Sequence, residues 1–181
     1  MLFDTAHALT ALIEKGYSDN PNDRGGPTNH GITEEVARAN GYTGDMKDLS
    51  EEEARRIAKK QYWDIMRLDD IGVLSPVIAT ELFDTGFNCG QLTAGKFLQR
   101  ALNALNRQTR DYGDLEVDGL IGPLTVMTLR KYLDKRKNDE GEKVMLRALN
   151  ALQGTYYISI SETRPKNEEF TFGWFRHRVA I

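Results

Sequence analysis

A glutamate near the end of a predicted helix is the residue of this sequence best suited to act as an acid. Apolar residues recur at spacings of three and four between positions 3 and 15, which predicts an amphipathic helix, and Gly16 is typical of the residue that follows a helix. Glu14 would lie at the negative end of the helix dipole, which disfavours its anion, and burial would raise its pKa further. A glutamic acid that keeps its proton near neutral pH can protonate the leaving oxygen of a glycosidic bond.

The segment after this helix is rich in turn-forming residues and supplies a second carboxylate. Asp23 follows Glu14 by nine positions, and Thr28 follows Asp23 by five, with Gly25–Gly26 between them. The glycines allow a sharp turn or a close approach of the backbone to a ligand. If the loop folds back, Asp23 and Thr28 face Glu14 across a cleft, where two carboxylates and a water held by Thr28 suit hydrolysis of a sugar linkage.

The same residues also have ordinary structural interpretations. A glutamate near a helix end is commonly a solvated surface residue, and Asp23 after Pro21–Asn22 is typical of a turn. The Asp-x-Gly-Gly run could also form a calcium loop, but it lacks the regular carboxylate spacing and the distal glutamate of such loops. Composition alone leaves these alternatives open.

The segment EKGYSDNPNDRGGPTNHGIT, residues 14–33, resembles the signature of the glycoside hydrolase family 108 muramidases. That signature reads Glu-Gly-Gly-Tyr, then Asp-x-Gly-Gly-x-Thr-x-x-Gly-Ile-Thr, and this sequence departs from it at Lys15. The resemblance implies that Glu14 is catalytic. The order Glu, Asp, Thr also resembles the catalytic triad of phage lysozymes, although the spacing from Asp23 to Thr28 is one residue shorter here. Four further residues of the motif are expected to contact substrate: Tyr17, Gly26, Asn29 and His30.

Two later segments resemble the same family. AKKQYWDIM at 58–66 resembles its Tyr-Trp helix, and LFDTGFNCG at 82–90 resembles its Phe-Asp-x-x-x-Asn-x-Gly segment. Tyr62 could stack on a sugar ring, but aromatic residues at helical spacing more often belong to a core. Asp84 and Asn88 are four residues apart on one helix face, where they either bind sugar groups or form a buried polar pair that ties helices together.

The second half of the chain has a different charge and a motif of its own. Residues 1–92 carry 9 basic and 16 acidic residues (net −7), whereas residues 93–181 carry 15 and 11 (net +4). A basic half invites an anionic partner, although this imbalance is also within ordinary scatter. VDGLIGPLT at 117–125 is similar to the Asp-Gly-x-x-Gly-Pro-x-Thr motif of helical peptidoglycan-binding modules, and it could specify a loop instead of touching a ligand.

Helical patterns dominate the chain. Cap signals and periodicity predict helices at 33–40, 51–66, 75–88, 93–106, 123–137 and 140–162, with a short one at 170–179 at best. Strand signals are confined to His30–Ile32 and Leu115–Val117. The predicted fold is mainly α, lysozyme-like and helical, with at most a very small β-ribbon. We expect a catalytic lobe at 1–91 and a helical peptidoglycan-binding-like lobe at 92–181 packed on it.

Several classes of function find little support. With Cys89 as the only cysteine, no intramolecular disulfide can form, and no apolar stretch approaches the ~20 residues of a membrane span. The three histidines lack metal-ligand spacing, and the acidic chain has no recognition helix for nucleic acid. We expect a monomer without metal or cofactor. No signal peptide is visible, so we also expect synthesis in the bacterial host cytoplasm and release to periplasmic peptidoglycan through a holin.

These observations lead to one expected function and two alternatives. The expected function is that of an endolysin, an N-acetylmuramidase that hydrolyses the β-1,4 bond between N-acetylmuramic acid and N-acetylglucosamine, with Glu14 as the general acid. The first alternative is a lytic transglycosylase, which needs the same glutamate but not Asp23. The second, of another class, is a non-catalytic phage protein that binds the wall.

Overall fold

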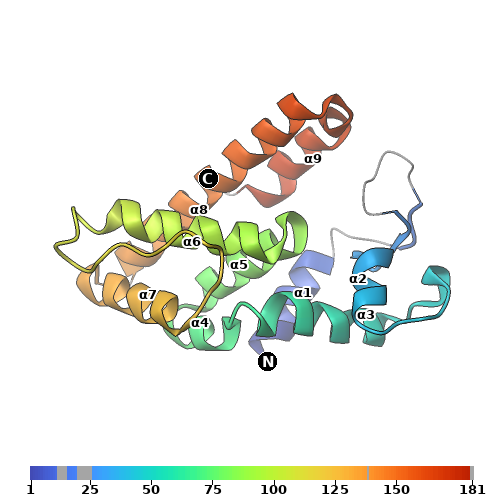
Figure 1. Ribbon diagram of the computed structural model, residues 1–181, viewed down its shortest axis with the longest axis horizontal. Coiled ribbons are helices and arrows are strands. Elements are labelled where there is room, and N and C mark those ends of the chain that lie inside the picture. Colours follow the sequence, from blue (N-terminus) through green and yellow to red (C-terminus); the bar gives the residue numbers. More distant parts are fainter. Residues whose placement is uncertain (12–15, 20–25, 138, 180–181) are drawn as a thin grey trace.

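The computed structural model describes residues 1–11, 16–19, 26–137 and 139–179, and these are mostly helical (Figure 1). Their only strands are β1 (Thr28–Asn29) and β2 (Ile32–Thr33), which pair antiparallel. A π-helical turn, η2 (Lys59–Asp64), and two 3-10 turns, η1 (Met46–Asp48) and η3 (Pro165–Asn167), complete the elements. The α-helices are α1 (Leu2–Ala11), α2 (Glu34–Ala39), α3 (Glu51–Ala58), α4 (Leu68–Leu74), α5 (Pro76–Cys89), α6 (Gln91–Leu105), α7 (Pro123–Lys135), α8 (Asp139–Thr163) and α9 (Glu168–Arg178). The predicted mainly α class with a very small ribbon is confirmed.

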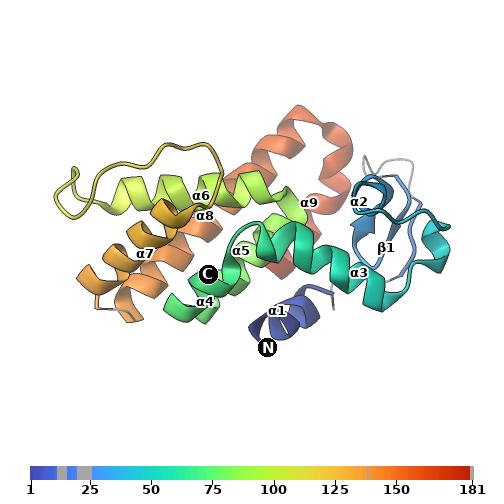
Figure 2. The ribbon, with the colours of Figure 1, turned by 60° about the horizontal axis from the view of Figure 1, so that its bottom comes forward.

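The elements form an elongated molecule with α5 near its centre. The β-hairpin, α2 and the start of α3 lie at one end, and α7 with the outer part of α6 lies at the other (Figures 1 and 2). The long helix α8 crosses α5 and α6 and then projects outward, and α9 returns along it toward the centre. The first and second halves of the chain therefore meet along α5.

The hydrophobic core is continuous between the two halves of the chain. Its large buried side chains include Trp63 and Phe83 from the first half and Leu98, Tyr132 and Leu149 from the second. Two lobes divided at residues 91 and 92 stay a prediction, but the apolar contacts do not stop at that point.

Local capping signals are confirmed at three helix starts. The hydroxyl groups of Thr33, Ser50 and Ser75 accept hydrogen bonds from backbone N–H groups of the first turns of α2, α3 and α5, at 3.3, 3.2 and 3.1 Å. These bonds satisfy donors that have no partner within the helix. Ser50 followed by Glu53 is the sequence pattern of a capping box, but the Glu53 side chain pairs with Arg56, so only the Ser50 bond of that motif forms.

Other predicted elements differ from the structure. The helix expected at 51–66 ends as an α-helix at Ala58 and continues as the wider turn η2, and Arg67, in the left-handed conformation (φ +53°), starts the unpredicted helix α4. The strand expected at Leu115–Val117 is wrong. The Asn103 side chain on α6 donates to the Leu115 carbonyl and accepts from its N–H, both at 2.8 Å, so a side chain takes the place of a partner strand.

Within the parts of the chain described here, no helix is both long enough and apolar enough to cross a membrane.

Candidate functional site

The two carboxylates predicted to be catalytic, Glu14 and Asp23, lie outside the described residues. The structure does describe the chain on both sides of them. Helix α1 leads up to Ala11, residues 16–19 follow Glu14, and the hairpin begins directly after the segment that contains Asp23. The described segments on either side of these two residues therefore define the candidate site.

The two flanks of Asp23 are held together by backbone hydrogen bonds. Ser18 and Thr28 exchange two N–H···O=C bonds of 2.8 Å, and Thr28 pairs with Thr33 in the hairpin. The hairpin turn is His30–Gly31, with φ of +50° and +74°, as the two-residue type I′ turn requires. Ser18 and residues 28–33 thus form a small ribbon with His30 in its turn, and the predicted contact of His30 with substrate stays a prediction.

The predicted catalytic threonine bonds within its own loop. The Thr28 hydroxyl donates to the Gly26 carbonyl at 3.1 Å, and Gly26 has a φ of +66°, which favours glycine. Both residues are half-buried. The predicted roles of Thr28 with a water and of Gly26 with substrate stay predictions.

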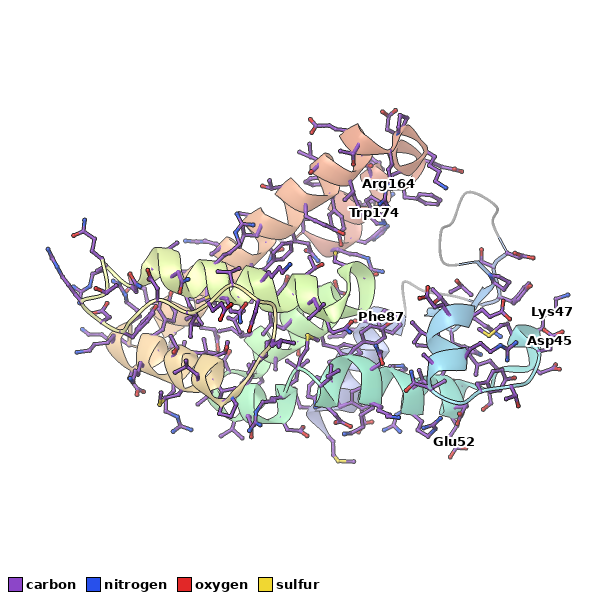
Figure 3. The ribbon with its side chains drawn as sticks, viewed as in Figure 1. Asp45, Lys47, Glu52, Phe87, Arg164 and Trp174 are labelled. Carbon is purple, nitrogen blue, oxygen red and sulfur yellow. The ribbon has the colours of Figure 1, made fainter. Side chains whose placement is uncertain are left out.

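Asn29 anchors the hairpin to the neighbouring loop. Its side chain is 5% exposed, and its amide donates to the carbonyls of Met46 at 2.8 Å and Lys47 at 3.3 Å. The Lys47 ammonium lies 5.5 Å from the ring centroid of Tyr17, which is exposed. Figure 3 shows Asp45 and Lys47 at the outer end of this part of the molecule, far from Phe87 and Trp174. The structure thus gives Asn29 a supporting role in the fold, and its predicted contact with substrate stays untested.

Tyr62 lies in the core, as the alternative interpretation of its spacing favours. It is 8% exposed, and its ring meets the half-buried ring of Phe87 edge to face at 5.1 Å between centroids. Burial raises the pKa of the Tyr62 hydroxyl to about 12. Stacking of Tyr62 on a sugar stays a prediction.

Asp84 and Asn88 share a helix face, but their side chains do not pair with each other. The Asn88 amide donates to the Asp84 backbone carbonyl at 2.7 Å. One carboxylate oxygen of Asp84, Oδ1, accepts from the Thr10 hydroxyl at 3.2 Å and from the Arg178 guanidinium at 2.7 Å. Asp84 therefore ties three helices together, which is the structural alternative for this polar residue.

The charge state of Asp84 is set by opposing effects. Burial raises the pKa of its carboxyl group, and the Arg178 guanidinium and the Thr10 hydroxyl act in the opposite direction because they stabilise the anion. The Arg178 side chain is only 2% exposed, and its guanidinium compensates the charge of the Asp84 carboxylate.

A cleft of about 790 Å³ opens beside this ion pair. Helices α1 and α5, Leu146 of α8 and the last turn of α9 line it, and its polar lining includes Glu81, Asp84, Arg176, His177 and Arg178. Most of the remaining lining is apolar, with Leu2, Leu9 and Val77. The cleft thus joins both halves of the chain.

Glu81 is a candidate acid that the sequence reasoning did not identify. Burial raises the pKa of its carboxyl group to about 7; the charge of Asp84 adds to this shift, and a hydrogen bond with the Asn150 side chain opposes it. Its Oε1 is buried and has no hydrogen-bond partner among the described residues. The signal in the sequence was a second carboxyl group, three residues before Asp84 in a mostly apolar helix.

Across the described part of the chain, no three His, Cys, Asp or Glu side chains come close enough together to hold a metal ion.

Comparison with known proteins supports a glycoside hydrolase that acts on peptidoglycan. Residues 8–90 match the model of the family glycosyl hydrolase 108, and residues 93–179 match the model of a predicted peptidoglycan domain. These two matches confirm the resemblance seen in the sequence, of the first half to the glycosyl hydrolase 108 family and of the second half to a peptidoglycan-binding-like domain.

One similar solved structure is that of SagA from Brucella abortus. It is 23% identical to this chain, with a TM-score of 0.62 over 93% of this chain and 95% of SagA, which shows a shared fold. None of the curated proteins matches the chain.

Proposed function

We propose that this protein is an N-acetylmuramidase that hydrolyses the β-1,4 bond between N-acetylmuramic acid and N-acetylglucosamine. The observation that carries the proposal is the segment of residues 14–33, which lies within the region matched to the glycosyl hydrolase 108 family. The pairing of Ser18 with Thr28 supports it, because this pairing brings the two ends of the Asp23 segment together beside the residues that follow Glu14.

In the proposed mechanism, Glu14 donates a proton to the leaving glycosidic oxygen. Asp23 stabilises the developing positive charge on the sugar or activates the attacking water, and Thr28 assists by holding that water. Proton transfer and a water molecule are sufficient for this reaction. The second half of the chain would hold the enzyme on the peptidoglycan, as its matched domain and its net charge of +4 favour.

We propose that the protein acts as an endolysin: it is made in the host cytoplasm and reaches periplasmic peptidoglycan after release by a holin. Detection of the protein outside cells that contain no holin would contradict this route.

The experiment is mass spectrometry of the soluble products from purified Gram-negative peptidoglycan. Wild-type protein should release fragments with reducing N-acetylmuramic acid ends, and Glu14→Gln should release none while remaining folded. Glu52→Gln is the matched control, because it makes the same chemical change at an exposed residue on the outer side of α3 (Figure 3).

Each other product pattern identifies an alternative. Ends with 1,6-anhydro-N-acetylmuramic acid would indicate a lytic transglycosylase and would remove the need for Asp23. A wild-type protein that sediments with peptidoglycan but releases no fragments would be a binding protein. A folded and fully active Glu14→Gln variant would exclude Glu14 as the acid.

A further inference from the structure

We propose that Arg178 and Asp84 are positioning residues for the reaction, so that the last helix of the predicted peptidoglycan domain completes the catalytic half of the protein. This inference rests on the proposed role of Glu14. The second half of the chain then has a part in turnover that is separate from any binding to the wall.

One carboxylate oxygen atom of Asp84 joins three helices. Asp84 Oδ1 on α5 accepts from Arg178 at the end of α9 at 2.7 Å and from the Thr10 hydroxyl on α1 at 3.2 Å. The partners lie 94 and 74 positions away from Asp84 in the sequence. Thr10 is 3% exposed, so water does not readily replace its bond to the carboxylate.

Thr10 connects this cluster to the segment that contains the proposed general acid. It lies in the last described turn of α1, four positions before Glu14. The bond to Asp84 fixes that turn against α5, and α5 is itself fixed against α9 by Arg178. A displacement of about 1 Å in a catalytic group can lower a rate about a hundredfold, so the helix that leads to a general acid requires a firm support.

The direction of α9 explains how Arg178, close to the end of the chain, comes to lie beside Asp84. The helix turns back at η3 and runs along α8 toward α5 and α1 (Figures 1 and 2). Contacts near its end secure this course: the rings of Tyr157 and Trp174 stack at 5.0 Å, and Gly154 leaves room for Phe175. Arg178 therefore arrives at Asp84 on a helix that is packed against α8.

Arg178 also meets an electrostatic need. A mostly buried carboxylate without a cation is costly, and a buried guanidinium without an anion is equally costly. The contact stabilises the Asp84 anion, because a carboxylate that turns away from Arg178 gives up this cation. That requirement makes the geometry at Asp84, and therefore at Thr10, specific.

The sharpest test is Thr10→Val, which removes one hydroxyl and keeps the shape of the side chain. We expect kcat on soluble glycan fragments of peptidoglycan to fall at least tenfold, with KM within twofold of wild type and the thermal transition still cooperative. Thr80→Val is the matched control: Thr80 lines the same cleft, and among the described residues its hydroxyl bonds only to the Pro76 carbonyl of its own helix, at 2.9 Å. Its kcat should stay within twofold.

Asp84→Asn and Arg178→Met should lower kcat by at least as much, and Arg178→Lys should restore part of the loss because it restores the cation. Arg176→Met, an exposed neighbour that lines the same cleft, is the control for the arginine change. Because Thr10 acts through Asp84, the double variant Thr10→Val/Asp84→Asn should be no slower than Asp84→Asn alone.

Three results would overturn the inference. A folded Thr10→Val protein with normal kcat would exclude the support of α1. A rise in KM at unchanged kcat would show that the cluster binds substrate directly. If the Thr80→Val and Arg176→Met controls lose as much kcat as the Thr10, Asp84 and Arg178 variants, the effect would belong to the lining of the cleft in general and not to this cluster. The proposed function fails separately, through an active Glu14→Gln protein in the same assay.

Discussion

The backbone of Gly119 rests directly on Gly95 of α6: a β-carbon at Gly95 would lie 2.0 Å from the Gly119 carbonyl oxygen. The Gln99 side chain, one turn along α6, secures the same loop. It accepts from the Gly119 N–H at 2.8 Å and donates to the Asp118 carboxylate at 2.7 Å and to the Leu120 carbonyl at 3.1 Å. The motif VDGLIGPLT thus specifies how a loop packs on a helix, and the exposed side chains of Val117 and Leu120 remain available to a partner.

Gly95→Ala should therefore destabilise the protein by about 1–3 kcal/mol, because the loop backbone must move to admit the methyl group. Alanine ordinarily favours a helix over glycine by about 1 kcal/mol, so destabilisation here would be contrary to helix propensity. Gly113→Ala is the control, since a β-carbon there meets nothing within 4 Å. Urea unfolding of both variants measures the difference. Equal stability of the two proteins would contradict the close packing.

Glu81 should make stability depend on pH. Its pKa is raised from 4.5 to about 7 in the folded protein, so the folded state binds the proton more tightly than the unfolded chain does. The resulting stabilisation is fully present below pH 4.5 and is lost as pH rises through 7, with a total of up to about 3 kcal/mol. Asp84 and Arg178 lie in the same cleft and remain unchanged in the test.

Glu81→Gln removes this titration. Compared with wild type, the variant should lose less stability between pH 5 and pH 8 in urea unfolding experiments. Parallel pH profiles for the two proteins would show that the Glu81 carboxyl group does not take up its proton near neutral pH.

Asn29→Ala should destabilise the protein by about 1–3 kcal/mol, because the buried carbonyl of Met46 and the carbonyl of Lys47 each lose a donor. Asn88→Ala is a useful comparison, since within the described parts of the chain the Asn88 amide bonds only to a carbonyl of its own helix, and its effect should stay within about 0.5 kcal/mol. If Asn88→Ala lowers activity at unchanged stability, its predicted contact with substrate gains support. Thermal unfolding with activity measured on the same samples separates the two cases.

We expect Tyr62 to stabilise the fold through its buried aromatic ring and not through its hydroxyl group. Tyr62→Phe keeps the edge-to-face contact with Phe87 and should leave both stability and turnover near wild type. Tyr62→Ala should cost about 3–5 kcal/mol, as loss of a large buried aromatic side chain does. A stable Tyr62→Phe protein with a strongly raised KM would instead show that the hydroxyl group contacts the sugar.

Much of the fold follows from short-range patterns in the sequence. Helix α5 begins at Pro76 because Ser75 caps it and proline suits the first turn, and both effects are complete within four residues. The hairpin follows from His30–Gly31, since glycine readily takes the positive φ of its turn. The motif of residues 14–33 likewise suffices for the family resemblance that the comparison with known families confirms.

Long-range partners could not be predicted in this way. The spacing of Asp84 and Asn88 shows that they share a helix face, but only the packing of α1 and α9 decides that Asp84 bonds to Thr10 and Arg178. The raised pKa of Glu81 depends equally on burial, which no local pattern encodes. The sequence pattern predicts a strand at Leu115, yet the Asn103 side chain on the preceding helix α6 satisfies the backbone N–H and carbonyl of Leu115. The sequence by itself determined most of the helices, three of their caps and the family motif, because these depend on neighbouring residues. The tertiary structure decided which polar side chains meet, because that depends on desolvation and on contacts between segments far apart in the chain.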